Sequence, residues 1–346
     1  MNLNICSKRH CSRKNHLWRT YTALVLGVII LFLSMMASVM GGIADIPAAT
    51  LWEAVTQFNA SNSRHLIVVD LRLPRVVSGA LAGAAFAVAG AIMQGVTRNP
   101  LADSGIMGIN AGAVFALSVC FSFFPGLGSK GLLWGSFMGA ALGAGLVIGA
   151  SSLRGGKTDP GRLVLAGAAV SALLTALSQG IALYFNVARN VMFWTTGGTA
   201  GSSWQQIQSV WQWIAGGIIC SFFLARPITM LSLGEDTAKG LGVNTRAVNL
   251  LCSVLVFILA GTAVSVVGAV GFVGLMVPHL VRFLVGVDYQ CILPVSAVFG
   301  AVLVVLADLC ARLINPPFET PLGSVIALLG VPFFLYLACK QRRSSS

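Results

Sequence analysis

The sequence predicts an all-α polytopic membrane protein with about ten transmembrane helices. Of its 346 residues, 56% are hydrophobic and only 9% are charged, against about 25% charged in an ordinary soluble domain. Apolar stretches of roughly 20 residues, the length that spans a bilayer, recur along the whole chain with short polar breaks between them. The predicted spans cover residues 20–40, 74–96, 107–124, 131–152, 163–185, 207–226, 247–267, 270–286, 292–313 and 321–339.

The placement of basic residues predicts the orientation of these spans. The net charge is +12, and with a cytoplasmic N-terminus most of the 22 Lys and Arg fall on the cytoplasmic side, as the positive-inside rule requires. This accounts for the basicity without a nucleic-acid partner. We expect a cytoplasmic basic tail over residues 1–19, a single transmembrane domain over residues 20–340, and a cytoplasmic tail over residues 341–346.

The first span follows a basic segment and could be mistaken for a secretory signal peptide. Its apolar run is too long for one, and no convincing small-residue cleavage site follows it. We therefore expect an uncleaved membrane helix.

Prolines flank the second span, one at its start and one shortly after its end. Pro74 suits the first turn of a helix, and Arg72 and Arg75 on either side of it share nearly one face. At the other end, "RNPLADSG" places Pro100 where the helix should stop, next to Asn99, whose amide both donates and accepts hydrogen bonds.

Glycines recur at four-residue spacing in two spans, at Gly79 and Gly83 in the second and at Gly135, Gly139 and Gly143 in the fourth. Such ridges allow helices to approach closely. We expect them to pack inside one subunit rather than to form a dimer face.

The loop "SSLRGGKTDPGR", residues 151–162, resembles half of a phosphate-binding loop. The motif needs a glycine where Ser151 stands, and it works only between a buried strand and a helix. Since a membrane span precedes this loop, we do not expect nucleotide to bind at Lys157.

The polar break between the sixth and seventh spans contains "GEDTAKGLGV", which predicts a short helix. Glu235 and Asp236 would lie at its start and Gly242 past its end.

An internal repeat relates the two halves of the chain. Residues 81–108 align without a gap to residues 259–286, so that Pro100 falls on Pro278 and Gly108 on Gly286. Five spans separate the copies, and an odd number means that they cross the membrane in opposite directions, as in the inverted repeats of many transporters.

Both copies are expected to be interrupted helices. The charge-free run over residues 247–277 is too long for one span and too short for two. Paired glycine- and proline-rich interruptions point to a translocation pathway. We assign that break to Gly268, Gly271, Gly274 and Pro278.

Three stretches together resemble a known family: "RLPR…GAAFAVAGAIMQGVTRNPLADSGIMGINAGA" from Arg72, "GEDTAKGLGV" from Gly234, and "GAVGFVGLMVPHLVRFLVG" from Gly268. With "ADLCAR" and "ETPLGSVIALLGVPFF", they are similar to the FecCD-type permeases of ABC importers for iron-siderophores, haem and vitamin B12, over residues 20–340. The resemblance implies the type II importer permease fold, a second permease subunit, identical or paralogous, and an extracytoplasmic binding protein. It also implies separate ATPase subunits that hold ATP and Mg²⁺, so that this chain binds no cofactor itself, and location in a bacterial plasma membrane.

The resemblance also implies roles for particular residues. Arg72, Arg75 and Arg312 would dock carboxylates of the binding protein through charge-assisted pairs, although arginines at a membrane boundary also fit simple snorkelling. The cytoplasmic gate would be formed by Asn99, Pro100 and Leu101, while Pro160-Gly161 departs from the small polar residues common in the second half of such a gate. The ATPase would contact a coupling element within residues 227–246, carried by Gly234, Glu235, Ala238, Leu241 and Gly242.

Two other classes of protein remain as alternatives. An ion-coupled secondary transporter usually needs acidic residues deep in its spans, where only Asp308 qualifies, and Asp308 could pair with Arg312 four residues later. An intramembrane enzyme needs a nucleophile, a metal or a redox centre, and no H-E-x-x-H motif is present. We therefore expect an ATP-driven permease with no catalytic or metal site, carrying a ferric siderophore, haem or cobalamin.

Overall fold

The computed structural model describes residues 3–42, 46–152, 160–196, 198–316 and 318–344, and within these ranges all regular structure is helical. Among the described residues, seven helices are long and apolar enough to cross a membrane, and three shorter apolar helices accompany them. These ten helices coincide with the ten predicted spans. Helices suit a bilayer because they satisfy their own backbone hydrogen bonds.

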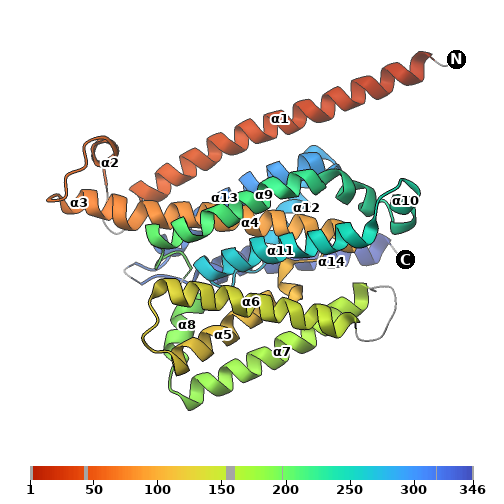
Figure 1. Ribbon diagram of the computed structural model, residues 1–346. Helices are drawn as coiled ribbons and strands as arrows, with labels where there is room; N and C mark the ends of the chain where they lie inside the picture. Colours follow the sequence, from red (N-terminus) through yellow and green to blue (C-terminus); the bar gives the residue numbers. More distant parts are fainter. Residues whose placement is uncertain (1–2, 43–45, 153–159, 197, 317, 345–346) are drawn as a thin grey trace.

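The ten apolar helices are labelled as in Figure 1. The longer ones are α1 (Leu3–Met40), α4 (Leu73–Thr97), α6 (Ser129–Ser152), α7 (Pro160–Tyr184), α9 (Trp204–Ser232), α11 (Thr245–Val267) and α13 (Tyr289–Leu313), and the shorter apolar segments lie in α5 (Ile109–Phe123), α12 (Val273–Val285) and α14 (Leu322–Ser344). Short helices connect them: α2 (Ala48–Thr56), α3 (Ser63–Leu66), η1 (Ile67–Arg72), η2 (Ser104–Met107), α8 (Ala188–Thr196) and α10 (Glu235–Gly240).

Helix α4 forms the centre of the bundle. It packs against α13, α11, α9 and α12. In the most apolar stretch of the span Ser63–Thr97, 78% of the residues are buried inside the chain. In the span of α7 the corresponding share is only 17%. Helix α7 therefore lies at the periphery, where its apolar side chains face lipid or another subunit.

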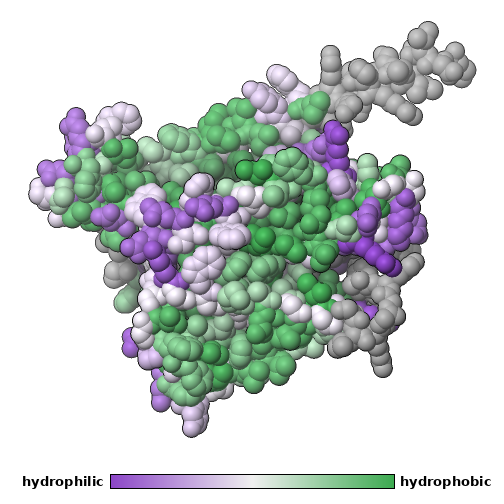
Figure 2. All heavy atoms as spheres, in the orientation of Figure 1, coloured by the Kyte–Doolittle hydropathy of each residue, from purple (hydrophilic) through white to green (hydrophobic). Residues whose placement is uncertain are grey.

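The surface has the distribution that a bilayer requires. Figure 2 shows hydrophobic side chains over most of the length of the helices, with hydrophilic side chains gathered toward their two ends. Large apolar residues such as Leu165, Leu183 and Phe223 are mostly exposed. In water such a surface would aggregate, so it indicates contact with lipid.

The second span begins earlier than the sequence predicted. Helices α3, η1 and α4 form one continuous run over Ser63–Thr97, so Pro74 does not start it. The turn before Pro74 is a π-helix in which the amide of Leu73 donates to the carbonyl of Val68. This wider turn lets the chain pass a proline, which has no amide hydrogen to donate, without ending the helix.

The predicted break in the second copy of the repeat is present. Helix α11 ends at Val267 and α12 begins at Val273, with positive φ angles at Gly268 (77°) and Phe272 (67°). The prediction is wrong for the first copy, since α4 continues through the matching position, Gly90, as far as Thr97.

The two copies run in opposite directions, as the inverted repeat predicts. Figure 1 shows α4 and α11 antiparallel to each other, and they are in contact.

The glycine ridges pack inside the chain, as expected. A Cβ atom added to Gly139 or Gly143 would collide with the backbone of Gly112 or Gly108 in α5 or at its start, and one added to Gly83 would collide with Gly300 of α13. The loop that contains Lys157 lies outside the described residues.

Candidate functional site

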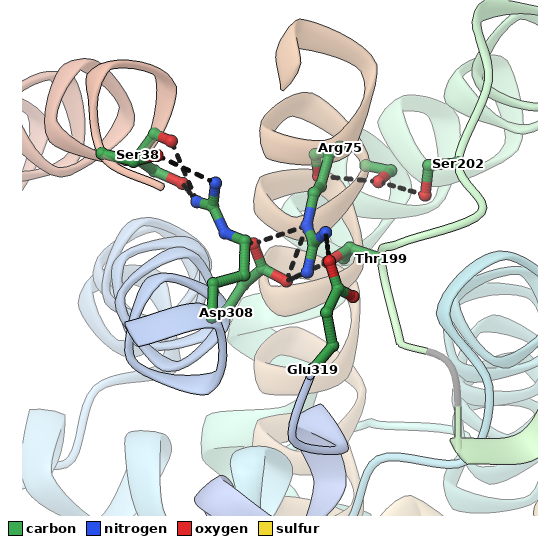
Figure 3. A network of polar contacts seen from close by, with 9 residues as sticks. Ser38, Arg75, Thr199, Ser202, Asp308 and Glu319 are labelled. Carbon is green, nitrogen blue, oxygen red and sulfur yellow. Dashed lines mark hydrogen bonds and ion pairs between the residues drawn. The ribbon is translucent and has the colours of Figure 1, made fainter. Parts of the chain in front are cut away.

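An ion cluster ties α4 to α13 and to the segment before α14. Figure 3 shows the guanidinium group of Arg75 between the carboxylates of Asp308 and Glu319. Its Nε and Nη2 atoms donate to Asp308 at 2.9–3.1 Å, and its Nη1 atom donates to Glu319 at 2.6 Å. The side chain of Asp308 is only 4% exposed, whereas that of Glu319 is 45% exposed. Arg75 thus joins a buried carboxylate to one at the surface.

Two further arginines attach α1 to the same cluster. Arg72 donates from Nη1 to the carbonyls of Val39 (2.6 Å) and Met40 (3.0 Å). Arg312 donates to the carbonyls of Gly41 (3.2 Å) and Ser38 (2.9 Å). These carbonyls lie at or just past the C-terminal end of α1, where helical carbonyls lack intrahelical partners and attract cations.

The charges of the cluster do not cancel. Arg312 also lies 3.3 Å from Asp308 at the predicted i, i+4 spacing, so Arg75 and Arg312 share Asp308, and three guanidinium groups stand near two carboxylates. Thr199 adds a hydroxyl hydrogen bond to Asp308. We name Arg72, Arg75, Arg312, Asp308 and Glu319 the arginine cluster. Its excess positive charge suits a partner that carries carboxylates.

A tight turn follows α4 at the opposite end of the bundle. Arg98 adopts the left-handed conformation (φ 53°), and the amide of Leu101 donates to the side chain of Asn99 at 2.9 Å. The predicted gate residues Asn99, Pro100 and Leu101 therefore form one compact turn, shaped by the Asn99 side chain.

Asp103, which sequence reasoning did not single out, joins this turn to α12. Burial raises the pKa of its carboxyl group, and the backbone amides of Ser104 and Gly105 oppose that rise. A Cβ atom on Gly274 would lie 2.6 Å from its Oδ1 atom, so only glycine leaves room for this carboxylate beside the first turn of α12.

Helix α12 also leans directly on α4. A Cβ atom on Gly90 would overlap the backbone of Gly274. The side chain of Gln94 donates to the carbonyls of Gly274 (3.2 Å) and Leu275 (3.1 Å). In a regular helix the Gly274 carbonyl would accept from residue 278, but Pro278 has no amide hydrogen, so Gln94 replaces the missing donor.

The four residues assigned to the break thus have different positions. Gly268 and Gly271 lie between the two helices, whereas Gly274 and Pro278 lie inside α12.

The short helix predicted in "GEDTAKGLGV" exists as α10. It begins at Glu235, which pairs with Lys239 at 2.8 Å, and it is preceded by Gly234 (φ 129°) and followed by Gly242 (φ 83°). Ala238 is completely buried, while Leu241 is 59% exposed. Ala238 therefore seats α10 against its own chain, and Leu241 is available to a partner.

A cavity of about 940 Å³ opens beside α10. It extends from Glu235 and Lys239 to Thr97 at the end of α4 and Met107 of η2. Helix α10 and the turn of Asn99 therefore share one end of the bundle, while the start of α4 and the end of α13, which carry the arginine cluster, lie at the other (Figure 1).

Nearly the whole transmembrane region matches one family. The model of the FecCD transport family matches residues 29–340, which is nearly all of the described chain. This chain belongs to the FecCD transport family.

Individual relatives agree with the family assignment. The iron(3+)-hydroxamate import permease FhuB of Bacillus subtilis is 50% identical over 94% of this chain and 85% of its own length. The hemin transport permease HmuU of Yersinia pestis is 36% identical over 95% of this chain and 99% of its own length. A solved chain of a metal-chelate type ABC transporter in an inward-facing conformation superposes with a TM-score of 0.79 at 27% identity, covering 92% of this chain and 98% of that one.

The FecCD chain is therefore a multi-pass permease subunit of an ABC importer, and it is not itself an enzyme, since the ATPase of such importers is a separate chain. Among the described residues, no three His, Cys, Asp or Glu side chains gather into a metal-binding group.

Sequence reasoning identified the three arginines and Asp308 of the FecCD chain but missed Glu319, Thr199 and Gln94. Glu319 is the first residue of the motif "ETPLGSVIALLGVPFF". Its acidic charge, close in sequence to Arg312, was the signal that could have identified it.

Proposed function

We propose that this FecCD chain imports a ferric siderophore, with a hydroxamate complex as the first candidate. The observation that carries this choice is the 50% identity to an iron(3+)-hydroxamate permease over most of both chains. Haem and cobalamin are the alternatives, because relatives at 36% and 35% identity are permeases for those compounds.

The substrate is tested by uptake into proteoliposomes. The permease is reconstituted with its ATPase and its binding protein. Accumulation of a radiolabelled ferric hydroxamate is then measured in the presence of an excess of unlabelled ferric hydroxamate, haemin or cobalamin. We expect the unlabelled ferric hydroxamate alone to compete. Competition by haemin or cobalamin instead would reassign the substrate.

We propose that the chain lies in the bacterial plasma membrane with both termini in the cytoplasm. The bias of basic residues supports this orientation. Residues 1–19 and 341–346 are then cytoplasmic tails that flank a single permease domain over residues 20–340. The arginine cluster faces outward, and α10 faces the cytoplasm.

The ATPase subunits would bind at α10, within residues 227–246, and ATP with Mg²⁺ would be held entirely by them. Leu241 is exposed where a partner could cover it, and Gly242 has open space around its Cα. Gly234 and Glu235 shape the start of the helix and Ala238 anchors it. A helix of this length is unstable alone, so it depends on packing to transmit movement.

A second permease subunit, identical or paralogous, would complete the pathway. The apolar and weakly buried face of α7 supports such a contact, because symmetric pairing of like subunits is common in assemblies of this kind.

The binding protein would dock on the arginine cluster. The contacts of the three arginines favour a division of this role. Arg72 and Arg312 donate to carbonyls at the end of α1, whereas Arg75 donates to an exposed residue, Glu319. We assign direct contact with the partner to Arg75, and we assign Arg72 and Arg312 to positioning the cluster and supplying its positive charge.

The cytoplasmic gate would be the turn of Asn99, Pro100 and Leu101. Asp103 connects this turn to Gly274, and Gly274 follows the break at Gly268 and Gly271, while Pro278 lies one turn further along α12. Because Asp103 packs against Gly274, a tilt of α12 would press on the gate directly, and a broken helix of this kind can alternate access across a membrane.

A further inference from the structure

Each of the three nitrogens of the Arg75 guanidinium group already donates a hydrogen bond to a carboxylate. Asp308 accepts from Nε and Nη2, and Glu319 accepts from Nη1. Arginine presents its donors in a fixed planar fork. Because the Arg75 side chain is only 12% exposed, an incoming carboxylate that approaches Nη1 competes with the carboxylate already bound there.

The two carboxylates differ sharply in how firmly they are held. Asp308 is 4% exposed and also contacts Arg312 and Thr199. Glu319 makes one ion pair, at Nη1, and its side chain is 45% exposed. Removing a buried carboxylate from its partners is expensive, whereas opening a half-exposed ion pair costs little. Glu319 is therefore the group that can be exchanged.

We propose that Glu319 is an internal substitute for a carboxylate of the binding protein: it occupies Arg75 in the resting permease and is displaced when the binding protein docks. This inference rests on the docking role proposed for Arg75. The partner is an acidic protein surface, because one carboxylate replaces another on the same donor.

The exchange would also transmit docking into the bundle. Glu319 lies three residues before α14, which begins at Leu322, while Arg75 lies in the first turn of α4 and Asp308 in α13. The pair of Arg75 and Glu319 therefore fastens the entry of α14 to the central helix. When a partner carboxylate takes Nη1, this fastening opens while the pair of Arg75 and Asp308 stays closed.

The test measures the affinity of the purified permease–ATPase complex, in lipid nanodiscs, for its binding protein. Glu319→Gln removes the competing charge and keeps the side-chain size, so we expect it to tighten docking roughly two- to fivefold. Glu53→Gln, at an exposed acid on α2, is the control for the general effect of one negative charge. We expect it to leave the affinity unchanged.

A double-mutant cycle separates competition from simple electrostatics. If Glu319 acts through Arg75, Glu319→Gln has no effect in a chain that already carries Arg75→Gln. The same gain in both backgrounds would show that Glu319 acts only by its charge and would overturn the inference.

The cycle also tests the docking role separately. Arg75→Gln alone, in complexes whose thermal unfolding shows that the permease is still folded, should weaken docking, while Arg64→Gln, at an exposed arginine on α3, should not. Weakened docking in Arg75→Gln with no gain in Glu319→Gln overturns the competition and leaves the docking role. Normal docking in Arg75→Gln overturns both.

Discussion

Arg75 and Asp308, 233 positions apart in the sequence, form a two-pronged ion pair between α4 and α13, with nitrogen to oxygen distances of 2.9–3.1 Å. The pair is buried, and Arg312 and Thr199 complete it from two other directions. A network of this kind holds its helices only while every member is present, since the loss of one partner leaves an uncompensated charge.

Asp308→Asn should therefore destabilise the permease strongly. Removing one partner of a buried ion pair costs roughly 3–5 kcal/mol, and here two arginines lose the carboxylate. The measurement is thermal unfolding of the purified permease in detergent, with Glu53→Gln as a control that should unfold like the wild type. Equal melting temperatures for Asp308→Asn and the wild type would show that the cluster does not hold the helices together.

Gly90→Ala should disrupt the contact between α4 and α12. The added methyl group would overlap the backbone of Gly274, and overpacking of a tight contact costs about 1–3 kcal/mol or more. Gly145→Ala in α6 is the matched control, because its Cβ atom would meet nothing within 4 Å. We expect lower thermal stability and reduced uptake for Gly90→Ala only. If both variants behaved alike, helix propensity rather than this contact would explain the result.

Asn99→Ala combined with Leu101→Ala should make the cytoplasmic end leaky. The first change removes the acceptor that shapes the turn, and the second removes the apolar side chain proposed to close the pathway. Passive release of a trapped ferric siderophore from proteoliposomes, without ATP, is the readout. Leu284→Ala, a partly exposed leucine of α12, should not leak. An unchanged release rate in the double variant would remove the gate from this turn.

Leu241→Asp should uncouple ATP hydrolysis from uptake. Leu241 is exposed at the end of α10, and burying a carboxylate in an apolar contact with the ATPase is unfavourable. We therefore expect coupled uptake to fall about tenfold, the size of a typical loss at an interface hot spot. Ala238→Trp is a poorer probe because Ala238 is fully buried in its own chain. Lys157→Ala should leave hydrolysis and uptake intact. Normal coupling in Leu241→Asp would move the ATPase contact elsewhere.

The local features of this protein could be predicted from its sequence because they depend on neighbouring residues. Ten apolar runs predicted ten helices, the glycines after Val267 predicted the break, and the i, i+4 spacing predicted the pair of Asp308 and Arg312. Acidic residues at the start and a glycine past the end predicted the two ends of α10 to within one residue.

The features that could not be predicted depend on which helices become neighbours. No spacing rule connects Arg75 to Asp308 or Glu319, or Gln94 to the carbonyl left open by Pro278. The start of the second span was misplaced because Pro74 is ordinarily a helix-starting residue, and only the π-turn before it shows how the helix continues.

The central claim is that ATP hydrolysis by a partner drives uptake through this permease. The most direct test reconstitutes the permease with its ATPase and binding protein in proteoliposomes and measures ferric siderophore uptake with ATP, without ATP, and after ionophores collapse the proton and sodium gradients. We expect uptake to require ATP and to persist after the gradients are collapsed. Uptake that continues without ATP and stops when a gradient is removed would contradict this account and identify an ion-coupled carrier.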